Sequence, residues 1–160
     1  FVKKKDIDLA IKIINSFGLK VVYDKNLFDQ KNIFSGTRKQ RIKNVQSALD
    51  NHETKAIFFA RGGYGSIQII DSINFENFSN HPKWLIGFSD ITTILIHAFQ
   101  QYGIQSIHGP MPFNFQNTDD ISLAQMFNLL KGVRGNIKFS YHKLNNRGVA
   151  SGKIIRSADE

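Results

Sequence analysis

The sequence predicts an α/β fold with an open, mostly parallel sheet flanked by helices, of the flavodoxin-like type. Three short runs between turn residues, 56–60, 83–88 and 104–107, are predicted to be strands. Helical patterns alternate with them along the chain, as they do in open α/β sheets. Because the run 56–60 contains no polar residue, we expect it to be a central parallel strand covered on both faces.

The other expected elements follow from periodicity and from stop signals. The expected helices cover 5–16, 37–50, 67–73, 90–102 and 119–130, and two further strands cover 20–23 and 136–141. Gly18 is placed to end the first helix, because glycine tolerates the left-handed conformation of a helix C-terminus. Thr37 is placed to begin the second helix, and Thr118 to cap the last one.

Length and composition limit the domain organisation. A chain of 160 residues with 41% hydrophobic residues can bury one core. We expect an α/β domain over residues 1–150, followed by 151–160 as the start of a linker or an aberrant tail.

The composition also excludes some kinds of chemistry. With no cysteine, disulfides and thiol chemistry are excluded. No apolar run is long enough to span a bilayer, so we expect a cytoplasmic protein with no membrane partner.

The charge pattern argues against nucleic acid as a partner. The formal net charge is +8, but the lysines and arginines are spread over separate segments and form no recognisable nucleic-acid module. Scattered positive charge is typical of a solvated surface. The histidines show no metal-ligand spacing, so we expect no metal.

Three marked segments follow three predicted strands. They read RGGYGS (61–66), GFSD (87–90) and HGP (108–110). In open α/β sheets, functional groups gather at the carboxyl ends of the strands. Topology alone is therefore expected to bring the three segments to one rim of the sheet.

Ser89 has two interpretations at such a place. At a strand-to-helix turn, a serine hydroxyl projects from the sheet edge, and the N–H of the next residue, Asp90, is free to stabilise an oxyanion. Gly87 leaves room for the turn, but Ile91 stands where esterases usually have a second glycine. The alternative is a helix N-cap, a role that serine often fills, and the pattern alone favours the cap.

The neighbouring residues also have alternatives. Gly62 and Gly63 permit close approach of a ligand to their N–H groups, or simply form a tight turn. Arg61 is either an anchor for an anionic substrate or a surface arginine. His108 is either a base or a side chain that fixes its own loop. The carboxylate of Asp90 either orients a base or stabilises a helix N-terminus.

Taken together, the segments resemble one known family. AIFFARGGYGSIQIID, PKWLIGFSDIT and GIQSIHGPM, with SGTRKQRIKNVQSALDN before them, are similar to the LD-carboxypeptidases. These serine peptidases include muramoyl-tetrapeptide carboxypeptidases and microcin C self-immunity peptidases. The likeness runs from about Ile7 to Gly152 and agrees in order, spacing and strand context.

The resemblance implies a site and a reaction. It assigns the nucleophile to Ser89 and the oxyanion hole to the N–H of Asp90 with the backbone of Gly62 and Gly63. The resemblance also implies that three residues at the active-site rim contact the substrate: Arg61, Tyr64 and His108. The implied partner is a murein-derived peptide from which a C-terminal D-residue is removed without a cofactor, and homodimers are common among such proteins.

The chain departs from the family pattern at both ends. Family members begin with a strand before the first helix, and their Glu and His come from a C-terminal domain whose opening segment is not matched at 153–160. We therefore expect a truncated chain that lacks its base and whose own activity is in question. Two alternatives stay open: a catalytically dead peptide-binding module, and a fragment of a microcin C-type self-immunity peptidase.

Overall fold

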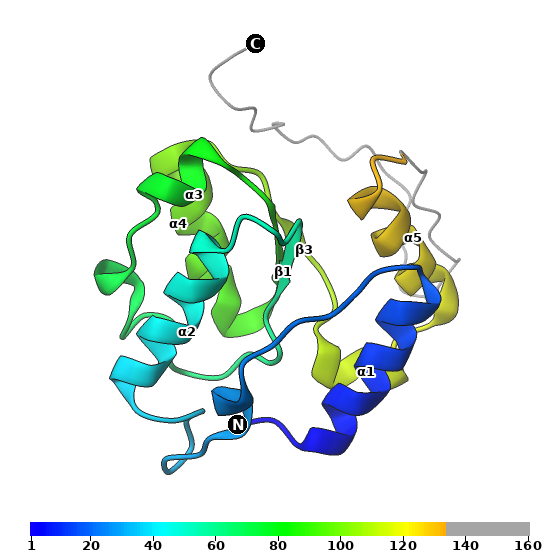
Figure 1. Cartoon of the computed structure of the whole chain (residues 1–160), viewed down its shortest axis with the longest axis horizontal. Coiled ribbons are helices and arrows are strands. Elements are labelled where there is room, and N and C mark those ends of the chain that lie inside the picture. The colour runs from blue at the N-terminus through cyan, green and yellow to red at the C-terminus, as the bar shows by residue number, and fades with distance from the viewer. Residues whose placement is uncertain (134–160) are drawn as a thin grey trace, which may run out of the picture.

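Three parallel strands position the site. In the computed structural model, residues 1–133 are described, and their sheet has the order β1-β2-β3 (Figure 1). The strands are β1 (Ala56–Phe58), β2 (Trp84–Gly87) and β3 (Ile107–His108). Both neighbouring pairs are parallel, with Phe58 beside Ile86 and Ile86 beside Ile107. The predicted open parallel α/β sheet is confirmed.

The central strand is β2, not β1. Leu85 and Ile86 of β2 are both fully buried, whereas each residue of β1 is only partly buried. Within residues 1–133, β1 lies at the edge of the sheet and pairs only with β2. Within residues 1–133, the expectation that 56–60 is a central strand is therefore wrong, but both of its faces are covered, because Ile57 packs against one cluster and Phe58 against the other.

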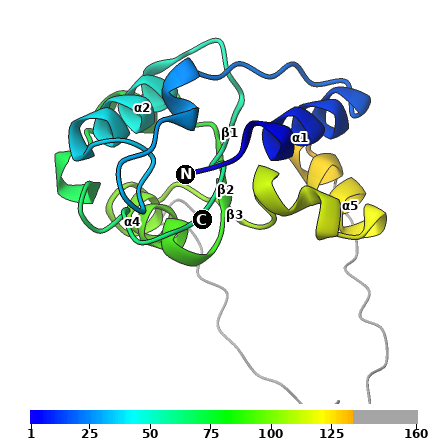
Figure 2. The same ribbon diagram turned by 90° about the horizontal axis from the view of Figure 1, so that it is seen from below.

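Helices cover both faces of the sheet. The α-helices are α1 (Lys4–Ser16), α2 (Arg38–Asp50), α3 (Glu76–Asn80), α4 (Thr92–Tyr102) and α5 (Asp120–Leu130). The 3-10 turns are η1 (Lys25–Phe28), η2 (Ile70–Ser72), η3 (Ser89–Ile91) and η4 (Pro112–Asn117). Figures 1 and 2 show α2, α3 and α4 on one side of the strands and α1 and α5 on the other. The fold is thus a three-layer α/β/α arrangement.

Two hydrophobic clusters fill the spaces between these layers. Leu85 belongs to the cluster under α2 and α4, which includes Leu49, Phe75 and Ile94. Ile86 belongs to the opposite cluster, which includes residues of α1 and α5. Successive side chains of a strand point to opposite faces, so this one pair of residues joins both halves of the core.

The helix ends follow mostly from the sequence. Gly18 has a φ of 79° after α1, as expected for a left-handed stop. Thr37 caps α2, accepting from the N–H of Gln40 at 3.2 Å. The cap of α5 is Asp119, which accepts from the N–H of Ser122 at 2.9 Å, and not the expected Thr118.

Two expected elements are absent or shortened. Residues 20–23 join no strand within the described part of the chain, and Val22 is 69% exposed. A β-branched run forms a strand only beside a partner, and this segment has none there. The helix expected over 67–73 is only the turn η2, and the backbone N–H of Ile73 bonds Ile70 O as it ends.

The remaining expectations fall outside the description. The strand expected at 136–141, the domain limit at 150 and the tail at 151–160 all lie beyond residue 133. No helix in the described range is both long and apolar enough to cross a membrane.

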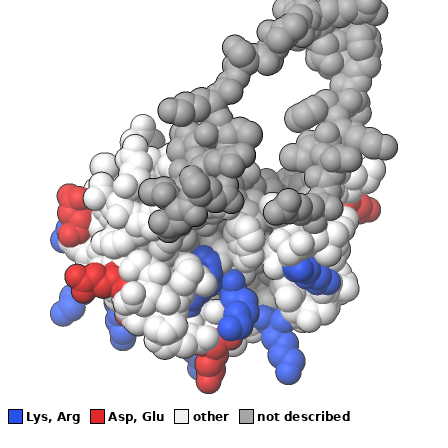
Figure 3. All heavy atoms as spheres, turned by 90° about the horizontal axis from the view of Figure 1, so that it is seen from above, with Lys and Arg blue, Asp and Glu red and all other residues white. Residues whose placement is uncertain are grey.

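On the face drawn in Figure 3, basic side chains are scattered and mixed with acidic ones.

Candidate active site

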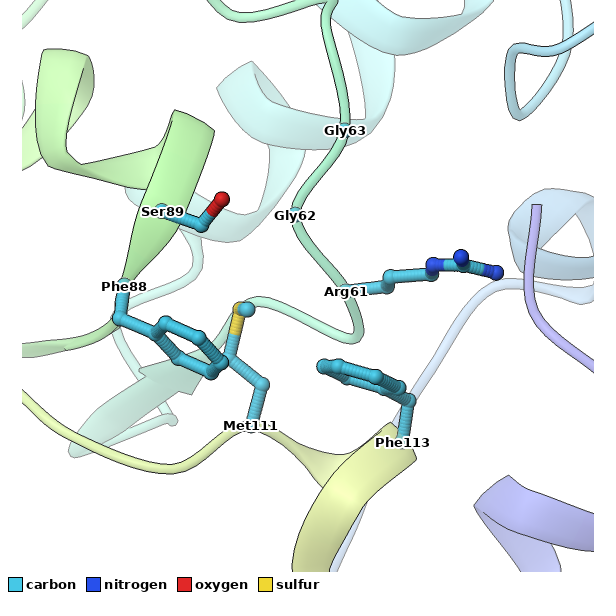
Figure 4. A pocket seen from close by; sticks show the side chains of 7 residues that line it. All are labelled: Arg61, Gly62, Gly63, Phe88, Ser89, Met111 and Phe113. Atoms are coloured by element: carbon cyan, nitrogen blue, oxygen red, sulfur yellow. The ribbon is translucent and has the colours of Figure 1, made fainter.

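The ends of the three strands meet around one cavity. It has a volume of about 260 Å³ and receives residues from the segments that follow β1, β2 and β3 (Figure 4). The lining residues are Arg61, Gly62, Gly63, Phe88, Ser89, Met111 and Phe113. The structure therefore brings the marked segments to one rim, as the topology predicts.

Ser89 occupies a strained turn between β2 and α4. Its φ is 59°, in the left-handed region that residues other than glycine seldom adopt. Such strain persists only where the surrounding structure enforces it, and it gathers at functional sites. The side chain is exposed, and Figure 4 shows its oxygen on the side facing the Gly62–Gly63 segment. This geometry presents the hydroxyl to the cavity.

The helix-cap interpretation of Ser89 is wrong. Phe88 holds the N-cap position of η3, and no side chain caps either η3 or α4. The Ser89 hydroxyl makes no hydrogen bond to any residue in the range 1–133. Its place in the turn is therefore not explained by stabilisation of the following helix.

Backbone amides without partners lie beside this hydroxyl. Gly62 approaches Ser89 so closely that an added Cβ would lie 3.2 Å from Ser89 Cβ and 3.4 Å from its Oγ. No carbonyl in the described range accepts from the N–H of Gly62, Gly63 or Asp90. Because these donors have no partner within residues 1–133, they are available there to an anionic oxygen.

The carboxylate of Asp90 makes hydrogen bonds that the sequence did not predict. Its Oδ2 accepts from the N–H groups of Gly65 and Ser66, both at 3.0 Å, and from the Ser66 hydroxyl at 2.9 Å. Within residues 1–133 it accepts from no histidine, and Asp90 lies in the first turn of η3, as expected of a residue that stabilises a helix N-terminus. It ties the turn after β2 to the loop after β1.

Arg61, Tyr64 and His108 lie around the cavity in different ways. The Arg61 guanidinium lies 5.5 Å from the ring of Phe113, and Figure 4 shows its side chain pointing away from Ser89. Tyr64 is 80% exposed and does not line the cavity. His108 is exposed at the end of β3, with its ring 6.3 Å from that of Phe88, also outside the lining.

The apolar wall of the cavity escapes sequence reasoning. Phe88 and Phe113 stack with their ring centroids 6.3 Å apart, and the fully buried Met111 lies with them in the lining. Phe88 lies within GFSD, and Met111 and Phe113 follow HGP by one and three positions, which is the only signal the sequence carries. Apolar residues at such places are expected in the core, so their function was not visible.

Among residues 1–133, no histidine or acidic side chain lines the cavity. Across residues 1–133, no group of His, Cys, Asp and Glu side chains is arranged to hold a metal ion. The described residues therefore supply a hydroxyl and free amides, but no group to take the hydroxyl's proton.

The chain belongs to the LD-carboxypeptidase family, because the model of that family's N-terminal domain matches residues 1–109. A probable murein peptide carboxypeptidase of Bacillus subtilis is 32% identical over 117 residues, which are 73% of this chain and 37% of that protein. A murein tetrapeptide carboxypeptidase of Pseudomonas aeruginosa is 33% identical over 110 residues, which are 62% of this chain and 36% of that protein.

Solved structures agree on the fold. The microcin C7 self immunity protein MccF, in complex with aspartyl sulfamoyl adenosine, superposes with a TM-score of 0.74 at 22% identity. The match covers 79% of this chain and 39% of MccF. The chain thus spans well under half the length of the relatives that it matches, and the fold it shares with them is that of their N-terminal part.

Proposed function

We propose that this chain is the nucleophile-bearing part of a serine LD-carboxypeptidase that removes the C-terminal D-residue from murein tetrapeptides. The observation that carries the proposal is the left-handed φ of 59° at Ser89, whose exposed hydroxyl faces a cavity beside Gly62 and Gly63. A serine held in this way at a strand-to-helix turn is the arrangement of a nucleophile elbow.

The chemistry assigns a role to each group. Ser89 Oγ attacks the carbonyl carbon between the L-residue and the terminal D-residue. The negative charge that develops on the carbonyl oxygen is stabilised by the N–H groups of Asp90, Gly62 and Gly63. The D-amino acid then leaves with a proton, and water hydrolyses the acyl-enzyme to regenerate the hydroxyl.

The base of this reaction comes from outside the described residues. A hydroxyl at its ordinary pKa is a weak nucleophile until an adjacent base accepts its proton. The family resemblance implies a histidine assisted by a glutamate, both from a C-terminal domain. In this proposal, the described residues bind the substrate and stabilise the oxyanion, and the partner domain moves the proton.

The substrate is held by two kinds of surface. The stacked rings of Phe88 and Phe113 give an apolar wall for the part of the peptide next to the scissile bond. We propose Arg61, Tyr64 and His108 as contacts farther out, where Arg61 offers a positive charge to the peptide's carboxylates. A cytoplasmic location, a role in peptidoglycan recycling and a homodimer belong to the same proposal and stay predictions.

A second function has one observation in its favour. Since no histidine or glutamate lines the cavity among residues 1–133, the competing function is a module that binds a peptide without turning it over. A related alternative concerns the substrate, because MccF was solved with aspartyl sulfamoyl adenosine. A peptide–nucleotide conjugate is therefore the competing substrate class.

One experiment separates these functions. The whole protein that contains this chain is incubated with a murein tetrapeptide or with a peptidyl-nucleotide conjugate, and the products are identified by mass spectrometry. The proposal expects release of D-alanine from the tetrapeptide, loss of release in Ser89→Ala, and normal release in Ser47→Ala, an exposed serine of α2. Cleavage of the conjugate alone would support the alternative substrate, and calorimetric binding without any cleavage would support the binding module.

A further inference from the structure

We infer that the carboxylate of Asp90 is a positioning group, which holds the Gly62–Gly63 amides at the correct distance from Ser89. The inference rests on the proposed function and adds to it a residue whose side chain touches neither the cavity nor the reacting atoms. It follows from three hydrogen bonds that converge on one oxygen atom.

Those bonds join two segments that are far apart in the sequence. Asp90 Oδ2 accepts from the backbone N–H groups of Gly65 and Ser66, both at 3.0 Å, and from the Ser66 hydroxyl at 2.9 Å. Ser66 is only 4% exposed, so water does not readily replace Asp90 as its partner. A donor that is shielded from water loses stability when its acceptor is removed, so these three bonds hold the loop in place.

The loop from Gly62 to Gly65 is held beside Ser89 at both of its ends. Asp90 directly follows Ser89, and Gly65 lies three residues after Gly62. At one end of the loop, Gly62 lies so close to Ser89 that an added Cβ would be 3.2 Å from Ser89 Cβ; at the other end, the N–H of Gly65 donates to Asp90. Any shift of the loop along the rim must break one of these contacts. The distance from the loop's amides to the Ser89 hydroxyl is thereby fixed.

A charge on Asp90 suits this role, and α2 supplies the compensating charge. Arg41 donates to Gln68 Oε1 at 2.7 Å, and its Nε would lie 3.2 Å from a Cβ added at Gly65. Burial lowers the pKa of Arg41, while the negative charge of Asp90 acts in the opposite direction. An ionised acceptor makes hydrogen bonds about twice as strong as a neutral one, which favours a carboxylate over an amide here.

The test compares Asp90→Ala, Asp90→Asn and Ser66→Ala in the whole protein, with kcat and KM for tetrapeptide cleavage measured separately. Oxyanion donors act in the transition state, so their displacement lowers kcat and leaves KM nearly unchanged. We expect a loss in kcat of about 100-fold for Asp90→Ala and about tenfold for Asp90→Asn, which keeps an acceptor oxygen. Ser66→Ala, which removes one bond of the three, is expected to lose less than Asp90→Ala.

A matched control separates positioning from stability. Asp119 also accepts from a backbone N–H, at the start of α5 and away from the cavity. Asp119→Ala should lower the Tm without changing kcat. In Asp90→Ala, the amide hydrogens of Gly65 and Ser66 should also exchange faster. If Asp90→Ala does not fold, Asp90→Asn and Ser66→Ala carry the same comparison.

The outcomes are distinguishable. A lower kcat with faster amide exchange at Gly65 supports the positioning role. A kcat equal to that of the unmodified protein, with only the Tm reduced, overturns the positioning role and leaves the proposed function intact. Absence of any turnover by the unmodified protein overturns the proposed function itself.

Discussion

Gly87 and Ile91 are in contact across the turn that carries Ser89: a Cβ added at Gly87 would lie 2.6 Å from Ile91 Cγ2. Ile91 is 5% exposed and belongs to the hydrophobic core, so it cannot move away without leaving a void. The isoleucine that departs from the usual esterase pattern thus packs onto the glycine that precedes the serine. This contact explains why position 87 accommodates no side chain.

Gly87→Ala should therefore destabilise the protein. Overpacking of a filled core costs about 1–3 kcal/mol, because a side chain or the backbone must shift. Urea denaturation measures the free energy of unfolding. The double variant Gly87→Ala/Ile91→Ala should lose less than the sum of the two single variants, with a coupling energy above about 0.5 kcal/mol. Strict additivity would show that the two residues are not in contact.

The left-handed backbone at Ser89 predicts a difference between two inactive variants. Alanine keeps the strain of a φ of 59°, and glycine adopts this conformation freely. Ser89→Gly should be more stable than Ser89→Ala by about 1 kcal/mol. Comparison of their urea midpoints checks this. If Ser89→Ala is the more stable of the two, the turn does not have the conformation described.

Steric pressure from Gly62 gives a prediction about activity. The methyl of Gly62→Ala would press on Ser89 Cβ, whereas the methyl of Gly63→Ala would point into open space. A displaced nucleophile loses its alignment with the carbonyl, which costs about 100-fold in rate. We expect Gly62→Ala to lower kcat/KM by about that factor and Gly63→Ala to lower it much less. Equal losses would contradict the close approach of Gly62.

Lys83 predicts a pH dependence of stability. Its ammonium group is buried and donates to Ala48 O, Asn51 O and Thr54 Oγ1 at the end of α2. Desolvation by this burial lowers the pKa of Lys83 from its ordinary value of 10.5. In the window just below 10.5, the unfolded chain therefore holds a proton that the folded chain has released, and stability rises with pH.

The measurement is the free energy of unfolding of the chain and of Lys83→Met between about pH 8 and 10.5. The rise that Lys83 contributes should be absent in Lys83→Met, so its profile should be flatter. Lys12→Met, on the exposed side of α1, serves as the control and should keep the rise. A steeper alkaline rise in Lys83→Met would contradict the expected sign.

Local chemistry made much of this fold predictable. Gly18 and Thr37 ended and began helices where the sequence placed them, because glycine and threonine fill those positions for reasons that need no tertiary contact. The convergence of three strand ends followed from parallel topology. Strand pairing could not be predicted, because it depends on which segments lie side by side in the fold. Residues 20–23 pair with no strand in the described range, and β1 lies at an edge of the sheet described.

The site was predictable only where a motif marks it. Ser89 and Gly62 stood out by position and residue type, and both line the cavity. Met111 and Phe113 also line it, but an apolar residue looks the same in a core and in a pocket wall. The three bonds to the Asp90 carboxylate could not be foreseen, because parallel topology brings the two loops to one rim but does not specify which of their atoms form hydrogen bonds.

Covalent labelling tests the nucleophile at position 89 most directly. The whole protein is treated with a fluorophosphonate probe, and the modified peptide is identified by tandem mass spectrometry. We predict a single adduct on Ser89, competed by murein tetrapeptide and abolished in Ser89→Ala. A protein that cleaves the tetrapeptide while its label sits on another residue, or while Ser89→Ala stays active, would contradict the account.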